Sequence, residues 1–225
     1  MTDEEKKPVG QTETLQEEKT RETETLRVIP DTDFMRARTF GDTSDAISPL
    51  VVAQVQGFRD AGILCAAKHF PGMGAIYTDA EPASTAKTLD EMRIEELEPF
   101  AEAIRAGSPF MVVGHISCPE ITGGDEPASL SSAVVTDLLR GEMGYTGVIV
   151  TDALSSPTLG DIGSGDACVR AILAGCDMVQ RPANFEEAYQ AVLDAVHDGT
   201  ISEERLNEAV ERILTTKLRL QPAAE

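Results

Sequence analysis

Ionisable side chains stand at the carboxyl ends of three short apolar runs in this sequence. Lys68 and His69 close the first run, His115 closes the second, and Asp152 lies near the end of the third. Lysine and histidine can hydrogen-bond a polar ligand, and a carboxylate can act as a nucleophile. Each residue alone also has a structural explanation, because a strand-end Asp often caps a turn and a histidine can be satisfied in the core. Their chemistry therefore depends on whether the elements that carry them lie side by side.

Four apolar runs alternate with amphipathic stretches along most of the chain. The runs are GILCAAKHF (62–70), PFMVVGHI (109–116), GVIVTDAL (147–154) and CDMVQRP (176–182). Each is short and bounded by Gly or Pro, as is typical of strands that are buried on both faces. A repeated helix-then-strand order predicts parallel strands with right-handed crossovers. Since such folds collect their chemistry at the carboxyl ends of the strands, the ionisable groups stand where a site is expected.

The stretches between the runs have helical periodicity. They cover residues 48–62, 89–107, 132–144 and 164–175, and two further helices, 184–199 and 202–220, close the chain. Several helices are expected to end at a left-handed glycine, namely Gly62, Gly107 and Gly175. Ser202 is expected to cap the last helix, in which Leu206, Ala209, Val210, Ile213 and Leu214 share one apolar face.

Composition and charge exclude several classes of function. The 225 residues carry a net charge of −20, which argues against partners such as nucleic acid and an anionic membrane surface. No apolar run has the length of a membrane span, and the first residues lack the apolar core of a signal peptide, so we predict a soluble, cytoplasmic protein. The four cysteines form no CxxC pair and there are three histidines, so we expect buried, reduced thiols and no metal site.

The chain divides by composition into a tail and a domain. Residues 1–33 are rich in Glu, Thr and Lys and nearly empty of large apolar groups. Such a segment cannot bury enough surface to offset its ordering entropy, so we predict a disordered, acidic, low-complexity tail. Residues 34–225 have a globular composition and are predicted to form one α/β domain.

Several motifs in one register resemble glycoside hydrolase family 3, and most of all its β-N-acetylhexosaminidase branch. They are AAKHFPGMG (66–74), PFMVVGHISCPEI (109–121), PASLSSAVVTDLLRGEMGYTGVIVTDAL (127–154) and AGCDMVQRP (174–182), with RARTFGD (36–42) upstream and AVERILTTKLRL (209–220) at the close. The resemblance implies a barrel-type fold, a carbohydrate substrate and a reaction that needs no metal or organic cofactor. It also implies cis peptide bonds around the Lys-His-Phe-Pro turn.

The resemblance assigns roles residue by residue. Asp152 matches the catalytic nucleophile, whose carboxylate attacks the anomeric carbon and forms a covalent glycosyl-enzyme. Lys68, His69 and Arg38 match positions that hydrogen-bond sugar hydroxyls. His115 matches a position that faces the site on the next strand, and it is assigned to substrate binding with them.

The loop after the Lys-His motif departs from the family. The branch places Asp-Ser-His there, with the His as general acid/base, whereas this chain has Asp79-Ala80-Glu81. Glu81 can serve as the acid/base if burial or a neighbouring carboxylate such as Asp79 raises its pKa. A carboxylate there also favours water over phosphate as the acceptor. The alternative is that the loop has drifted and the site is weak or inactive.

The barrel itself is predicted to be partial. A complete (β/α)₈ barrel needs about 250 residues, and only four strands are evident here. The resemblance therefore implies an α/β fold of a partial TIM-like (β/α) barrel with parallel strands. Four strands leave two edges and an apolar sheet face open. Either a second copy (a homo-oligomer) or a complementing chain covers them, or the chain is a fragment of a longer protein.

The function expected from these features is retaining, exo-acting hydrolysis of terminal β-linked N-acetylhexosamine, in carbohydrate metabolism or cell-wall recycling. A β-glucosidase-like activity is the first alternative. The second is a catalytically silent remnant or subunit that binds sugar or a partner chain. Hydrolysis of aryl glycosides by the wild type and by an Asp152 variant separates these hypotheses.

Overall fold

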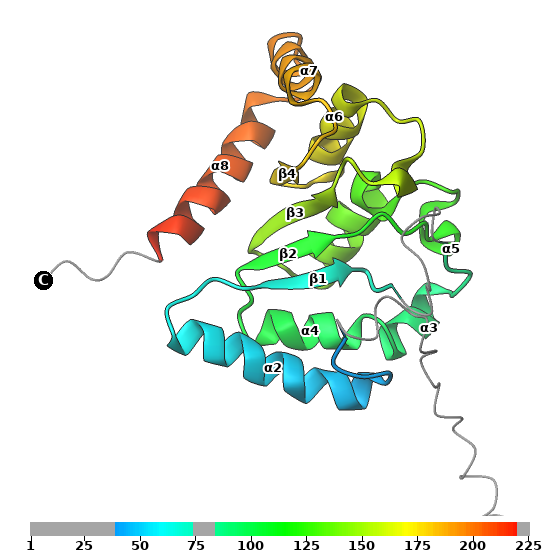
Figure 1. Cartoon of the computed structure of the whole chain (residues 1–225), viewed down its shortest axis with the longest axis vertical. Helices are drawn as coiled ribbons and strands as arrows, with labels where there is room; N and C mark the ends of the chain where they lie inside the picture. Colours follow the sequence, from blue (N-terminus) through cyan, green and yellow to red (C-terminus); the bar gives the residue numbers. More distant parts are fainter. Residues whose placement is uncertain (1–38, 74–83, 220–225) are drawn as a thin grey trace, which may run out of the picture.

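A parallel four-stranded sheet forms the centre of the computed structural model, which describes residues 39–73 and 84–219 (Figure 1). The strands are β1 (Ala66–Phe70), β2 (Phe110–Val113), β3 (Val148–Ala153) and β4 (Met178–Gln180), in the order β1-β2-β3-β4. Every neighbouring pair is parallel. The predicted parallel α/β architecture is confirmed, although each strand is shorter than the apolar run that contains it.

The helices follow the predicted alternation. They are α2 (Ser44–Asp60), α3 (Leu89–Ile94), α4 (Glu98–Arg105), α5 (Pro119–Thr122), α6 (Ser164–Ala174), α7 (Phe185–His197), α8 (Glu203–Leu218), the 3₁₀ turns η2 (Ala128–Leu130) and η4 (Pro157–Leu159), and the π-helix η3 (Ala133–Glu142). The stretch 89–107 forms two helices instead of one. Pro99 lies in the first turn of α4, where its missing N–H is tolerated, whereas it would interrupt a continuous helix.

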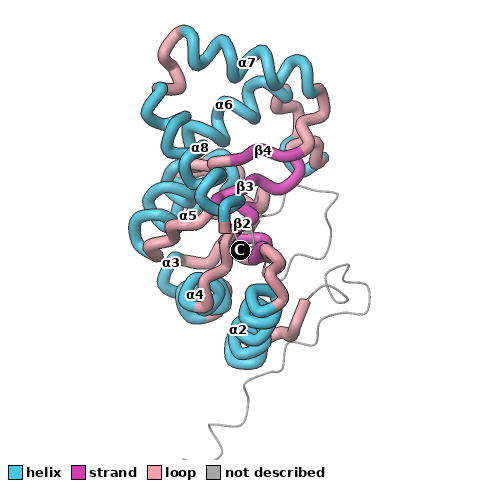
Figure 2. The backbone as a smooth tube through the Cα atoms, turned by 90° about the vertical axis from the view of Figure 1, so that its left-hand side faces the viewer, coloured by secondary structure: helices cyan, strands magenta, loops and turns pink. Residues whose placement is uncertain are grey.

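The described helices cover one face of the sheet. Figure 2 shows α3, α4 and α5 on that side, with α8 across the amino ends of the strands, and buried residues of α6 belong to the same apolar cluster. Met111, Val113 and Ile149 point into this layer and are fully buried in the main apolar cluster. On the opposite face no described helix lies against the sheet, and Met178 of the edge strand β4 is exposed. A half-covered parallel sheet is the partial barrel wall that the sequence predicts.

The predicted helix ends are confirmed. Gly62, Gly107 and Gly175 have φ angles of 68°, 85° and 115°, the left-handed region that glycine adopts at no steric cost. The Ser202 hydroxyl accepts a hydrogen bond from the Arg205 amide at 3.1 Å and so caps α8.

The apolar face of α8 is largely exposed, in contrast to most amphipathic helices. Ala209 is buried, whereas Leu206, Val210 and Leu214 are exposed. The helix is instead attached to the sheet by two arginines, Arg205 and Arg212, which reach the same carboxylate.

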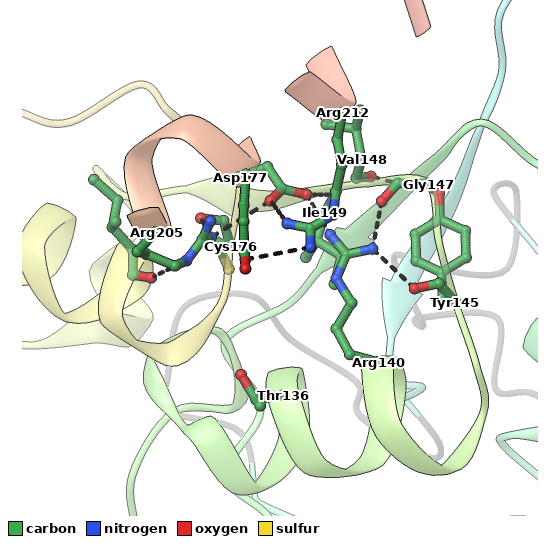
Figure 3. A network of polar contacts seen from close by, with 12 residues as sticks. Thr136, Arg140, Tyr145, Gly147, Val148, Ile149, Cys176, Asp177, Arg205 and Arg212 are labelled. Atoms are coloured by element: carbon green, nitrogen blue, oxygen red, sulfur yellow. Dashed lines mark hydrogen bonds and ion pairs between the residues drawn. The ribbon is translucent and has the colours of Figure 1, made fainter. Parts of the chain in front are cut away.

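That carboxylate belongs to Asp177, just before β4, and its side chain is fully buried (Figure 3). Arg212 lies 3.0 Å from it, Arg205 lies 3.4 Å from it, and Arg140 of η3 pairs with its other oxygen. The Ile149 amide also donates to Asp177 Oδ2 at 2.9 Å. One buried carboxylate therefore joins α8, η3 and β3 at the amino ends of the strands, where residues of barrel folds serve stability.

The predicted tail, residues 1–33, lies outside the described residues. Within residues 39–73 and 84–219, no helix is both long and apolar enough to cross a bilayer. Cys118, Cys168 and Cys176 are buried free thiols, whereas Cys65 is partly exposed.

Candidate active site

His69 and Asp152 meet at the carboxyl ends of β1 and β3. The distance from His69 Nε2 to Asp152 Oδ2 is 3.4 Å. The histidine is nearly buried, at 6% exposure, whereas the Asp152 side chain is 39% exposed. A carboxylate held against a buried imidazole with its other side open to solvent is accessible to a ligand.

Two breaks in strand register bring these side chains together. Between β1 and β2 the register shifts after Lys68, so that His69 is an extra residue opposite β2. Between β3 and β4 it shifts again after Val150, just before Asp152. Such irregularities bend a strand and re-aim a side chain, and they are common beside active sites.

Lys68 belongs to the same face of the sheet as Asp152. Lys68 pairs with Val112, which pairs with Val150, and Asp152 follows Val150 by two residues. Because side chains on a strand alternate between faces, this register places both groups on the face that no described helix covers. Lys68 is exposed.

A glycine permits the close approach of the first two strands. A Cβ atom on Gly114 would lie 3.1 Å from His69 Cβ, closer than ordinary contacts allow. Gly114 also donates its amide to the Phe70 carbonyl at 2.8 Å, which continues the pairing beyond β2. Any side chain at this position would press on His69.

The turn after His69 is tightly packed. The Gly72 amide donates to the His69 carbonyl at 2.8 Å, and Gly72 has a φ of 121°. A Cβ on Gly72 would meet Glu96 Cβ at 2.7 Å, so the turn lies directly on that side chain. The Lys68–His69 and Phe70–Pro71 bonds are both cis, as the family resemblance implies.

The Asp152 carboxylate also accepts a hydrogen bond from the backbone of the next residue. Its Oδ1 accepts a hydrogen bond from the Ala153 amide at 2.8 Å, while Oδ2 faces His69. The carboxylate is thus held between one backbone donor and one imidazole. This arrangement restricts its rotation without burying it.

His115 uses both ring nitrogens within the protein. Its Nδ1 lies 2.7 Å from the Ser129 hydroxyl, and its Nε2 lies 3.0 Å from the Ala153 carbonyl. Burial lowers the pKa of His115, and this effect is opposed by the bond to Ala153 and by the Asp152 charge. The structure gives His115 contacts with the backbone of the site, and its predicted role in sugar binding is untested.

Three predicted site residues, Arg38, Asp79 and Glu81, lie outside the described residues. Their roles remain predictions. Among the residues that the structure does describe, no three His, Cys, Asp or Glu side chains are grouped as metal ligands.

Sequence reasoning did not single out Ser129 or Gly114. Both lie within the quoted motifs, Ser129 in PASLSS and Gly114 directly before His115. A buried serine carries no signal of its own in a sequence. A glycine between a buried strand and a histidine is a weak signal of close backbone approach.

The comparisons with known proteins agree on one family. Residues 26–216 match the family described as the glycosyl hydrolase family 3 N terminal domain. Beta-hexosaminidase A of Pseudoalteromonas piscicida is 31% identical over 214 residues, covering 85% of this chain and 36% of its own length. A beta-N-acetylglucosaminidase/beta-glucosidase of Cellulomonas fimi is 31% identical over 198 residues, covering 81% of this chain and 35% of its own length.

A solved structure agrees in fold as well. The glycoside hydrolase family 3 beta-N-acetylglucosaminidase from Paenibacillus sp. str. FPU-7 superposes with a TM-score of 0.79 at 36% identity, covering 85% of this chain and 38% of that one. The chain thus spans little more than a third of the length of these relatives.

Proposed function

Because the chain belongs to glycosyl hydrolase family 3, we propose that it acts in the retaining, exo-type hydrolysis of terminal β-linked N-acetylhexosamine, in carbohydrate metabolism or cell-wall recycling. The observation that carries the proposal is the pairing of Asp152 with His69 at 3.4 Å, at the strand ends where the family motifs meet. The names of the Pseudoalteromonas and Paenibacillus relatives support the choice of sugar.

In the proposed first step, a carboxylate oxygen of Asp152 attacks C1 of the terminal sugar. The C1–O glycosidic bond breaks, its electron pair leaves with the aglycone oxygen, and Glu81 protonates that oxygen. In the second step Glu81, now a carboxylate, takes a proton from water as the water oxygen attacks C1. The ester bond to Asp152 breaks, and the sugar leaves with its original β configuration. Lys68, His69 and Arg38 hold the sugar hydroxyls.

Removal of the nucleophile tests the reaction. Asp152→Ala should lower kcat on an aryl N-acetyl-β-glucosaminide by roughly 10³-fold or more, as expected when a covalent nucleophile is lost. Asp194→Asn, which changes an exposed carboxylate on α7, is the matched control and should retain activity. If the wild type and Asp152→Ala are equally inactive, the chain alone is not an enzyme, and the alternative of a silent subunit is favoured.

Removal of the acid tests Glu81 separately. Glu81→Gln should slow substrates with poor leaving groups much more than activated aryl glycosides, because only the former need a proton on the departing oxygen. An equal effect on both kinds of substrate would reject the role of Glu81 as general acid and would favour a drifted loop.

A β-glucosidase-like activity is the second candidate. The Cellulomonas fimi relative, named for both activities, is the observation that favours it. The ratio of kcat/KM on aryl N-acetyl-β-glucosaminide to that on aryl β-glucoside decides between the two. A ratio below one would favour β-glucosidase-like activity over N-acetylhexosaminidase activity.

We also propose that further polypeptide completes the site. The support is the uncovered sheet face and the two edge strands, β1 and β4, in the part of the chain that the structure describes. In this proposal residues 34–225 form the partial barrel, residues 1–33 form a separate tail, and a second copy or a complementing chain covers the open face. An active, monomeric species in light scattering would contradict it.

A further inference from the structure

We infer that His115 and Ser129 are a positioning pair for the Asp152 carboxylate and that His115 does not bind the sugar. The inference rests on the proposed function, because it concerns the orientation of the nucleophile. It follows from four contacts that run in sequence from η2 through the segment after β2 and through β3 to β1.

The contacts of His115 determine which ring nitrogen carries the proton. A backbone carbonyl only accepts, so Nε2 must donate its proton to the Ala153 carbonyl at 3.0 Å. In the neutral imidazole Nδ1 is then an acceptor, and the Ser129 hydroxyl donates to it at 2.7 Å. The Ala153 carbonyl therefore fixes the tautomer, and the contacts with Ala153 and Ser129 together fix the plane of the ring.

Ser129 is itself held rigidly. The residue is fully buried, and its amide donates to the Gly114 carbonyl at 3.1 Å. The Cys176 thiol approaches its carbonyl at 3.6 Å. The backbone of Ser129 is therefore attached to Gly114, directly after β2, and to Cys176. These contacts hold its hydroxyl in one position beside His115.

The far end of this chain of contacts is the nucleophile. His115 holds the carbonyl of Ala153, whose amide in turn donates to Asp152 Oδ1 at 2.8 Å. The next amide, that of Leu154, is held by the Gln180 carbonyl at 2.9 Å. The backbone is irregular here, because the β3–β4 register shifts at this point, so it needs support from outside the ladder. His115 supplies that support from the segment after β2.

The same contacts argue against His115 as a sugar ligand. Both ring nitrogens already have protein partners, and the residue is only 8% exposed. A sugar hydroxyl could bond the ring only by displacing Ser129 or Ala153. His69, in contrast, touches the carboxylate directly.

Steady-state kinetics separates positioning from binding. Ser129→Ala and His115→Leu should lower kcat about 10-fold and about 100-fold, with KM within about twofold, since a small misplacement of a reacting group is costly. His115→Gln keeps a donor for the Ala153 carbonyl and should recover part of the loss. Ser117→Ala, which removes a nearby buried hydroxyl with no partner among the described residues, is the control. An unchanged kcat with a raised KM would overturn the inference in favour of sugar binding.

Nuclear magnetic resonance tests the inference without activity. In the wild type, ¹⁵N shifts of His115 should report the neutral Nε2–H tautomer. Ser129→Ala should change that signal and shift the Asp152 and Ala153 amides, whereas Ser117→Ala should not. If the wild type fails to hydrolyse any aryl glycoside, the proposed function fails while these spectra still decide the positioning. Unmoved Asp152 and Ala153 amides in a folded Ser129→Ala protein would refute it.

Discussion

At the scale of single residues, His115 and Asp152 lie in opposite environments although they share one chain of contacts. Burial lowers the pKa of the His115 imidazole, whereas Asp152 is partly open to solvent. A neutral ring can accept from Ser129 and donate to Ala153 at the same time. A protonated ring would have two donors, so the Ser129 hydroxyl would have to rotate and accept from Nδ1 instead of donating to it.

The lowered pKa of His115 predicts a loss of stability on acidification. In the unfolded chain a histidine binds a proton near pH 6.5, whereas folded His115 binds it only at a lower pH. The unfolded state therefore holds more protons below about pH 6.5, and the free energy of unfolding falls until the folded pKa is reached, by at most about 1.4 kcal/mol per pH unit for this group.

Urea unfolding of the wild type and of His115→Gln at pH 7.5 and 5.5 measures this contribution. The variant lacks the titrating ring, so its stability should depend less on pH over this interval. Identical pH dependence in the two proteins would mean that His115 titrates in the folded state as it does in the unfolded chain.

Gly114 offers a second prediction at this scale. Gly114→Ala would place a methyl group 3.1 Å from His69 Cβ, and the backbone of β1 must shift to relieve it. We expect a loss of about 1–3 kcal/mol in the free energy of unfolding and a clear fall in kcat. Gly124→Ala, whose Cβ meets no atom within 4 Å, is the control for the loss of a glycine. Equal losses of stability and of kcat in the two variants would show that β1 and β2 can move apart at this point without cost.

At the scale of elements, the periodic patterns predicted much of the fold. Alternating runs and amphipathic stretches are local properties, so the four parallel strands, the cap at Ser202 and the three helix-ending glycines all follow from the sequence. The register breaks beside His69 and Asp152 do not, because they arise from pairing between strands about 44 and about 28 residues apart along the chain. The contact of Ser129 with His115 is also a tertiary contact, because it joins η2 to the segment that follows β2.

The apolar stripe of α8 shows the limit of periodicity in another way. The pattern correctly identified the face that Leu206, Val210 and Leu214 share, but not what would cover it. The helix is attached through its arginines to Asp177 instead. That aspartate lies inside an apolar run, CDMVQRP, where an unpaired charge would be costly. A charged residue in such a run indicates that a buried partner exists, but the identity of that partner depends on the tertiary fold.

The Asp177 centre gives a prediction about element packing. Asp177→Ala should cost about 3–5 kcal/mol in the free energy of unfolding, because Arg140, Arg205 and Arg212 would lose their shared buried counter-charge (Figure 3). Asp166→Ala removes an exposed pair with Arg170 on α6 and should cost less than about 1 kcal/mol. Denaturant unfolding measures both. Small and similar losses of stability in both variants would mean that water hydrates the three arginines when the Asp177 carboxylate is absent.

At the scale of the whole molecule, the negative net charge opposes association of two copies, whereas the open sheet face favours it. The chain carries 39 acidic and 19 basic residues, so two copies repel at a distance. The described part of the chain also has two edge strands and an uncovered sheet face, both of which favour association. Which effect dominates depends on ionic strength, because salt screens charges over about 10 Å at 0.1 M and leaves the burial of apolar surface intact.

A second copy on the open face therefore predicts association that strengthens with salt. Sedimentation equilibrium at 20 mM and 500 mM NaCl should show the apparent mass rising from one chain toward two, and kcat per chain should rise with it if the added surface completes the site. Sulfate should not replace chloride as the anion in this experiment, because sulfate strengthens apolar burial independently of charge screening. A mass of one chain at both salt concentrations, without activity, would contradict self-association and favour a different polypeptide as the cover. Association that weakens with salt would mean that opposite charges, not the apolar face, hold the copies together.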